Sequence, residues 1–146
     1  MRSIYDNVIP QIAVNARLAT ATSTSAVIDT KGHNSAMITV KATGCAGSPT
    51  ASQVVATITE SDTEAGTYTT ATDVGGTTLA ATAVNTSGDA QASARIEGLN
   101  QNRKRFIKVV LTPTITGGTN PAFTATAVVL LDRSYQEPVT TATSNT

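Results

Sequence analysis

The chain has 146 residues, a formal net charge of zero, and only 14% charged and 3% aromatic residues. This length fits one domain, and a neutral chain with few aromatic residues argues against a protein that binds nucleic acid over its whole surface. The single cysteine excludes an internal disulfide framework and a zinc site built from several cysteines. No stretch approaches the roughly 18 consecutive apolar residues of a membrane-spanning helix, so we expect neither nucleic-acid nor membrane partners.

Residues 1–25 are predicted to form an extended N-terminal arm and linker. The apolar side chains of the arm follow neither the helical period nor the strand period. Pro10 also lacks the N–H that a helix or a sheet ladder requires, so we expect the arm to stay outside the regular sheet. It would lie either over its own domain or on a neighbouring chain. The candidate protein-contact residues of this arm are Ile4, Tyr5, Val8, Ile9 and Ile12.

Residues 26–137 are predicted to form the folded domain, beginning with short strands that alternate apolar and polar side chains. Residues 26–29 favour a short strand that ends in a Lys-Gly-His-Asn turn. A strand over residues 36–42 follows, and another over residues 53–61 places Val54, Ala56 and Ile58 on one face. Each strand therefore has one face suited to a core.

The middle of the domain reads as hairpins. Residues 62–66 are a candidate hairpin turn, and residues 67–69 would return from it. A weak strand is expected over residues 79–84, and Ala92, Ala94 and Ile96 mark the inner face of a further strand.

Residues 103–113 combine strong strand formers with a cluster of basic residues. Ile107, Val109 and Leu111 fall on one apolar face, which must be covered, while Phe106, Lys108 and Val110 fall on the other. Pro113 is expected to end this strand. The basic residues suit either a solvated sheet edge that discourages stray pairing or contact with an acidic partner. The candidate contact residues of this cluster are Arg103, Lys104, Arg105 and Lys108.

The last strong strand is expected over residues 123–131, with residues 128–131 buried on both faces. Residues 138–146 contain no core-forming side chain and predict a flexible C-terminal tail. About seven to nine short strands with turns between them, and no amphipathic helix, predict an all-β fold. The expected architecture is an antiparallel β-sandwich or a jelly roll.

The residue types that usually carry catalysis are isolated in this sequence. His33 lies in a turn without a nearby nucleophile, and we interpret it as a surface residue. Cys45, in a Thr-Gly-Cys-Ala-Gly segment, is interpreted as a small, partly buried side chain. The paired glycines at Gly75 and Gly117 match neither phosphate-binding pattern. We therefore predict no enzymatic activity and no cofactor.

The acidic run Glu60, Asp62 and Glu64 is the best candidate for a metal site. Oxygen ligands at alternate positions suit calcium, but the twelve-residue calcium loop pattern is absent. An exposed acidic hairpin tip is the more ordinary interpretation, so no metal site is predicted.

The order of several segments resembles a group of small proteins from tailed double-stranded DNA bacteriophages. The resemblance rests on residues 57–62 and 66–69, which would form an acidic hairpin, on the basic strand of residues 104–112, and on the closing strand of residues 125–131. It covers roughly residues 25–132. The chain departs from the pattern at residues 57–59 and 130–132, and these departures concern packing more than function.

The resemblance implies a capsid decoration (cement) protein on the exterior of a phage head, present in the host cytoplasm before assembly. Such proteins stabilise the shell by bridging capsomers, so the implied partners are the major capsid protein and further copies of the chain, as a dimer or trimer. The alternative within a virion is a tail-tube or head–tail joining protein. The alternative of another class is a carbohydrate-binding β-sandwich module.

Overall fold

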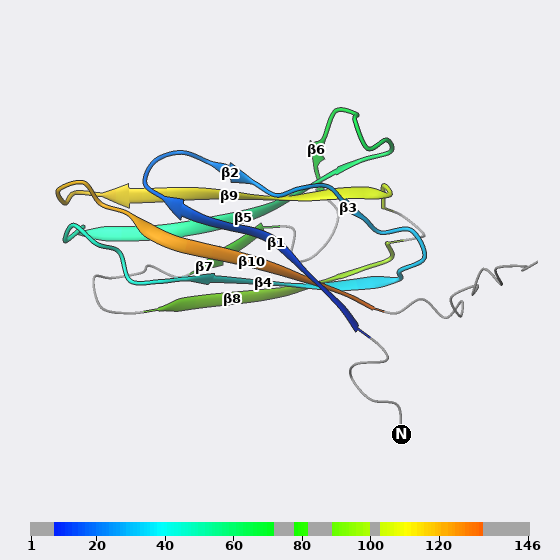
Figure 1. The fold of residues 1–146 in the computed structure, drawn as a ribbon, viewed down its shortest axis with the longest axis horizontal. Coiled ribbons are helices and arrows are strands. Elements are labelled where there is room, and N and C mark those ends of the chain that lie inside the picture. Colours follow the sequence, from blue (N-terminus) through cyan, green and yellow to red (C-terminus); the bar gives the residue numbers. More distant parts are fainter. Residues whose placement is uncertain (1–7, 72–77, 82–88, 100–102, 133–146) are drawn as a thin grey trace, which may run out of the picture.

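The computed structural model describes residues 8–71, 78–81, 89–99 and 103–132, and these residues form two antiparallel sheets packed face to face (Figure 1). The described residues contain strands and no helix, which confirms the predicted all-β sandwich. The strands are β1 (Val8–Leu18), β2 (Ser23–Thr24), β3 (Ile28–Asp29), β4 (Ser35–Ala42), β5 (Ala51–Ser61), β6 (Thr69–Thr70), β7 (Thr78–Ala81), β8 (Ala90–Glu97), β9 (Phe106–Thr116) and β10 (Phe123–Asp132).

The first sheet, called sheet A, has the strand order β1-β10-β4-β8. Its inner face follows the alternation predicted from the sequence, because every second residue of β4 and β10 is buried. Val129 and Leu131 are buried on this face, whereas Val128 and Leu130 are only half-buried on the other. The prediction that residues 128–131 are buried on both faces is therefore wrong, since nothing among the described residues covers the outer face of sheet A.

The second sheet, called sheet B, has the order β2-β9-β5-β6, with β3 also paired to β9 and β7 to β5. Its centre is the antiparallel pair of β5 and β9, whose register runs without interruption from Ala51 opposite Thr116 to Ser61 opposite Phe106. The β5–β6 pairing confirms the predicted hairpin after residue 61. Strand β7 begins one residue before the predicted weak strand of residues 79–84 and covers residues 79–81 of it, whereas residues 82–84 are outside the described residues.

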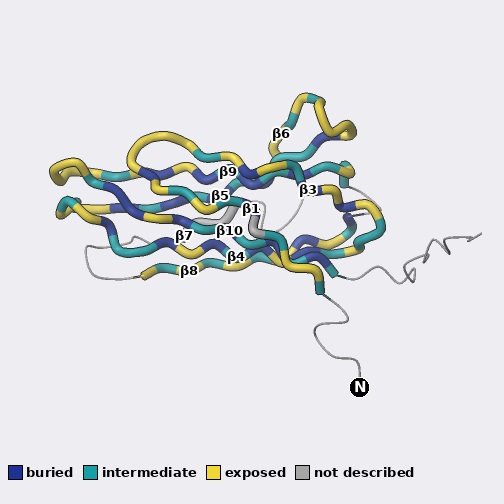
Figure 2. Tube along the Cα trace, viewed as in Figure 1, coloured by how far each residue is buried: buried dark blue, intermediate teal, exposed yellow. Residues whose placement is uncertain are grey.

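The core lies between the two sheets and consists mainly of aliphatic side chains. Figure 2 shows buried residues alternating with less buried ones along β4, β5, β9 and β10. The predicted inner face of β9 is confirmed, because Ile107, Val109 and Leu111 are completely buried. The largest completely buried side chains that sheet A and β5 add are Ile38, Val40, Val54, Ile58, Ile96, Val129 and Leu131.

The expectation that the N-terminal arm lies outside the sheet is wrong for Val8–Leu18. This segment is β1, an edge strand paired to β10 along its length. The register with β10 shifts between Ile12 and Val14, at a bulge. The residues that face inward therefore change from one set of alternate positions to the other, which makes the apolar spacing irregular. Pro10 is compatible with the strand because edge strands tolerate proline. Ile4 and Tyr5 lie outside the described residues.

The expectation that Pro113 ends its strand is also wrong, because β9 continues to Thr116 with Pro113 opposite Val54. Val109 exchanges hydrogen bonds with Ser25 through both its N–H and its carbonyl, so odd-numbered residues of β9 direct their backbone groups away from β5. The pairing with β2 ends at Leu111. The nitrogen of Pro113 therefore points away from β5 and lies past the end of the pairing with β2. The hydrogen-bond ladder between β9 and β5 loses nothing from the absent N–H.

The end of the sandwich where β4 and β9 finish is built from two interlocked loops, residues 43–50 and 117–122. The Thr119 N–H donates to the Gly47 carbonyl at 2.8 Å, and the Ala46 N–H donates to the Ala122 carbonyl at 2.9 Å. Gly47 has a φ of +84°, and a Cβ there would lie 2.4 Å from the Thr119 carbonyl oxygen. Only glycine fits this crossing, which joins sheet A to sheet B.

The two faces of β9 give a direct test of the sandwich. Val109→Asp would bury an unpaired charge in the core and should lower the free energy of unfolding by more than about 3 kcal/mol. The matched change Val110→Asp, on the half-buried outer face, should cost about 1 kcal/mol or less. Urea unfolding of both variants makes the comparison, and equal costs would contradict the assigned faces.

Candidate interaction surface at the charged end

Acidic and basic side chains meet where β5 ends and β9 begins. Because Ser61 lies opposite Phe106, residues that leave β5 are neighbours of those that enter β9. Strand β3 adds Asp29, which also lies opposite Phe106. We call this region the charged end and define it by Asp29, Glu60, Asp62, Tyr68, Arg103, Lys104, Arg105 and Lys108. In contrast, residues 42–59 and 109–131 contain no charged side chain.

The most buried ion pair of the charged end joins Arg103 to Glu60. The Arg103 Nη1 and Glu60 Oε2 atoms are 3.0 Å apart, and the two side chains are only 1% and 12% exposed. At this depth the arginine cannot present its guanidinium to a partner, so it is no longer a candidate contact residue. The pair instead fixes residues before β9 to the end of β5.

Arg105 makes a two-pronged pair with Asp29. Its Nε and Nη2 atoms donate to the two carboxylate oxygens at 2.8 and 2.6 Å, and its guanidinium lies 4.8 Å from the centre of the Phe106 ring. The hydrogen bond from Arg105 is the largest cause that lowers the pKa of Asp29 below its ordinary value. The same bond raises the pKa of Arg105. Thr30 adds backbone and hydroxyl bonds to the Arg105 carbonyl, which anchor β3 beside β9.

The hairpin between β5 and β6 is tied to the outer face of β9 by an aromatic contact. The Lys108 Nζ atom lies 4.0 Å from the centre of the Tyr68 ring, a cation–π geometry. The Tyr68 hydroxyl donates to the Glu64 carbonyl at 2.9 Å. Desolvation first, and the Glu64 charge second, raise the pKa of Tyr68. These contacts give the hairpin a defined position over the sheet.

Lys104 and Asp62 form the most open pair of this surface. Their Nζ and Oδ2 atoms are 3.8 Å apart, and the Asp62 side chain is 79% exposed. Glu60 and Asp62, two carboxylates of the predicted calcium candidate, thus face arginine and lysine within the chain. Within the described ranges, no group of three or more histidine, cysteine, aspartate or glutamate side chains is arranged to hold a metal ion.

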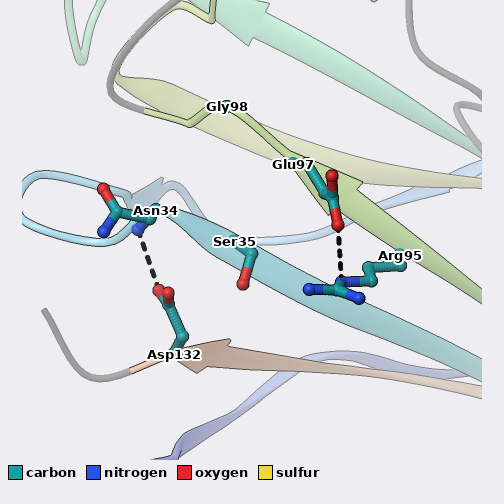
Figure 3. Close-up of a pocket in the computed structure, with 6 residues that line it drawn as sticks. All are labelled: Asn34, Ser35, Arg95, Glu97, Gly98 and Asp132. Atoms are coloured by element: carbon teal, nitrogen blue, oxygen red, sulfur yellow. Dashed lines mark hydrogen bonds and ion pairs between the residues drawn. The ribbon is translucent and has the colours of Figure 1, made fainter.

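A second polar site lies at the same end but on sheet A. Figure 3 shows a hollow lined by Asn34, Ser35, Arg95, Glu97, Gly98 and Asp132. The Asn34 N–H donates to Asp132 Oδ1 at 2.9 Å, and Arg95 Nε is 3.0 Å from Glu97 Oε1. Both carboxylates are therefore engaged in local contacts. No sequence pattern marks this hollow, because its residues come from three strands and the positions next to them.

His33 contacts Asp132, which lines this hollow, and it is only partly exposed, less than the surface residue that the sequence suggested. Its side chain is 14% exposed, and its Nδ1 atom contacts the Asp132 backbone oxygen. The contact holds the β3–β4 turn against the end of β10. Cys45, predicted to be partly buried, is completely buried in the core. His33 precedes the start of β4 and Cys45 follows its end, so the two residues lie at opposite ends of this strand.

The structure assigns different positions to the remaining predicted contact residues. Val8 is half-buried at the start of β1, and Ile9 is one of the few large apolar side chains that are exposed. Lys104 and Lys108 are half-buried and Arg105 is exposed. Sequence reasoning missed Asp29 and Tyr68 as members of this surface, since only the sheet register shows which residues face Arg105 and Lys108.

Comparison of the chain with protein-family models, with curated proteins and with solved structures gave no match. The described ranges include no helix of the length and apolarity needed to cross a membrane. The site must therefore be interpreted from its own geometry.

The depth of the Arg103–Glu60 pair predicts a large effect of breaking it. Glu60→Ala leaves a deeply buried guanidinium without this carboxylate and should lower the free energy of unfolding by about 3 kcal/mol. Asp62→Ala removes an exposed carboxylate of the same hairpin and should cost less than about 1 kcal/mol. Chemical denaturation of the two variants measures the difference, and similar costs would refute the structural role of Glu60.

The lowered pKa of Asp29 predicts a pH-dependent contribution to stability. Because the folded-state value is below the unfolded one, the contribution is complete above the ordinary value of about 3.9 and is lost as the pH falls through the folded pKa. Asp29→Asn should therefore cost about 0.5 kcal/mol at pH 7 and less near pH 2. Denaturation at both pH values provides the measurement, and a cost that does not change with pH would contradict the ion pair.

Proposed function

We propose that this chain is a capsid decoration protein of a tailed bacteriophage, which binds the outer surface of the head and bridges neighbouring capsomers. The observation that carries the proposal is the arrangement of the segments with phage resemblance. The acidic hairpin and the basic strand are neighbours in sheet B, since β5 pairs with both β6 and β9. The closing strand is β10, the partner of both β1 and β4. The similar segments thus form the framework of the sandwich.

The charged end supports a role in protein recognition. Three basic residues lie at the start of β9 or just before it, namely Lys104, Arg105 and Lys108. Two acidic residues from other segments are paired with them, Asp62 with Lys104 and Asp29 with Arg105. A fixed array of both signs suits recognition of a protein surface with its own charge pattern. The proposed partner is the major capsid protein.

The start of β1 offers a second area for contact with the shell. Ile9 is an exposed large apolar side chain of β1. Met37, the other exposed large apolar side chain among the described residues, lies on the opposite face of sheet A and is not part of this area, because Ile9 is opposite Leu131 whereas Met37 is opposite Leu130. Val8 and Ile9 are the described members of the predicted contact set of the arm, together with the backbone of Ile12. In the proposal, this area and the charged end contact different subunits of the shell.

The test is binding to undecorated heads of the phage that encodes the chain. The double charge reversal Lys104→Glu with Lys108→Glu should weaken binding by tenfold or more at low salt, and raised salt should slow attachment of the unaltered protein. The matched control is Arg17→Glu with Lys41→Glu, two basic residues on sheet A away from the charged end. It should bind as the unaltered protein does.

Two outcomes would overturn the proposal. The first is failure of the unaltered protein to bind any head, and the second is its location on the tail in electron micrographs of whole particles, which would favour the tail-tube or head–tail alternative. Equal losses in both double variants would reject the charged end as the contact while leaving head binding in place.

A further inference from the structure

The edges of the two sheets differ in how they are protected against pairing with another chain. The β1 edge carries Pro10 and a register shift, two features that discourage added strands. On the other sheet, Ser25 and Thr30 hold β2 and β3 along the edge of β9, and Pro113 lies beyond them. These edges are poor acceptors of a further strand.

Strand β8 is the outer strand of sheet A on the opposite side and has none of these features. It contains neither proline nor glycine, and its register to β4 runs without a shift from Ala90 opposite Ala42 to Glu97 opposite Ser35. Among the described strands it pairs with β4 alone. Figure 1 shows β8 along one long margin of the sandwich, with β7 of the other sheet nearby.

The inner face of β8 is also less covered than that of its neighbour. Ala90, Ala92 and Ala94 point toward the core but remain half-buried, whereas the four inward residues of β4 are buried. The edge of β8 is regular, and its small apolar side chains are incompletely covered. Both features favour the addition of another strand at this edge.

We propose that β8 pairs antiparallel with β8 of a second copy of this chain, so that two four-stranded sheets become one continuous sheet across a two-fold axis. Such an interface is isologous, because the same strand serves both copies. The half-buried alanines would then gain cover from the second sandwich. This inference is independent of the proposed function, since it rests on the edge of β8 alone.

Overlap of the two strands and charge together favour one register for this pairing. Directly opposite residues share a face, so only registers that place one β8 residue opposite its own copy are possible. Pairing centred on Ala94 places Ser93 opposite the partner's Arg95 and Gln91 opposite the partner's Glu97, with no like charges opposed. The pairings centred on Ser93 and on Ala94 overlap the most residues of Ala90–Glu97, and the one centred on Ser93 opposes Asp89 to the partner's Glu97. Pairing centred on Ala92 opposes no like charges but overlaps fewer residues of the strand. The Ala94 register therefore avoids repulsion.

The first experiment measures the mass of the full chain in solution over a concentration series. The unaltered protein should reach the mass of a dimer. Ala92→Lys places an inward charge on the β8 edge, a device that blocks strand addition, and should weaken dimerisation by tenfold or more. The matched control is Ala16→Lys, a half-buried inward alanine on the β1 edge, which should dimerise normally. A monomer at every concentration, or a normal dimer for Ala92→Lys, would overturn the proposal.

The second experiment keeps the proposal testable if Ala92→Lys fails to fold. Opposite residues in an antiparallel pair have Cα atoms about 4.5–5.5 Å apart, which is compatible with a disulfide. Ala94→Cys in a Cys45→Ser background should form an inter-chain disulfide under mild oxidation, and Ala16→Cys in the same background should not. Absence of the Ala94→Cys cross-link, or equal cross-linking of both variants, would overturn the assigned edge and register.

Discussion

The antiparallel pairing of β5 with β9 is the interaction on which the rest of the structure depends. Its uninterrupted register places Val54, Ala56 and Ile58 on the same face as Ile107, Val109 and Leu111, and burial of that face against sheet A forms the core. The same register brings the end of β5 to the start of β9 and so creates the charged end. One pairing therefore sets both the hydrophobic core and the position of the ion pairs.

The fold class and most strands could be predicted because alternation of apolar side chains is a local property of the sequence. The alternation fails at β1, where the shift between Ile12 and Val14 changes the inward parity and Pro10 suggests a break. The prediction that Pro113 ends its strand was wrong for a related reason. A proline interrupts a sheet only where its nitrogen faces a paired strand, and the sequence alone does not show which side of β9 this nitrogen faces. Only the basic residues of the candidate site could be predicted, because they are neighbours in the sequence. Asp29, Glu60 and Tyr68 come close to them through pairing between strands that are distant in the sequence.

The charges are distributed unevenly, and this asymmetry guides the functional proposal. One end of the sandwich is closed by the neutral, interlocked loops around Gly47, which restrict the backbone and carry no charge. The other end carries ion pairs that range from the deeply buried Arg103–Glu60 pair to the open Lys104–Asp62 pair. Burial makes the first pair structural, whereas exposure leaves the second available to a partner. A rigid sandwich with one patterned end suits a protein whose role is to bind other proteins.

The central functional claim is that the chain is attached to the outside of a phage head, and a cryo-electron-microscopy map of intact particles tests it most directly. The account predicts density for two packed antiparallel sheets on the outer surface of the shell, at junctions between capsomers, with the residues around Lys104 and Lys108 in contact with the shell. Density for this sandwich inside the tail or at the head–tail joint, or a head with no such density, would contradict the account.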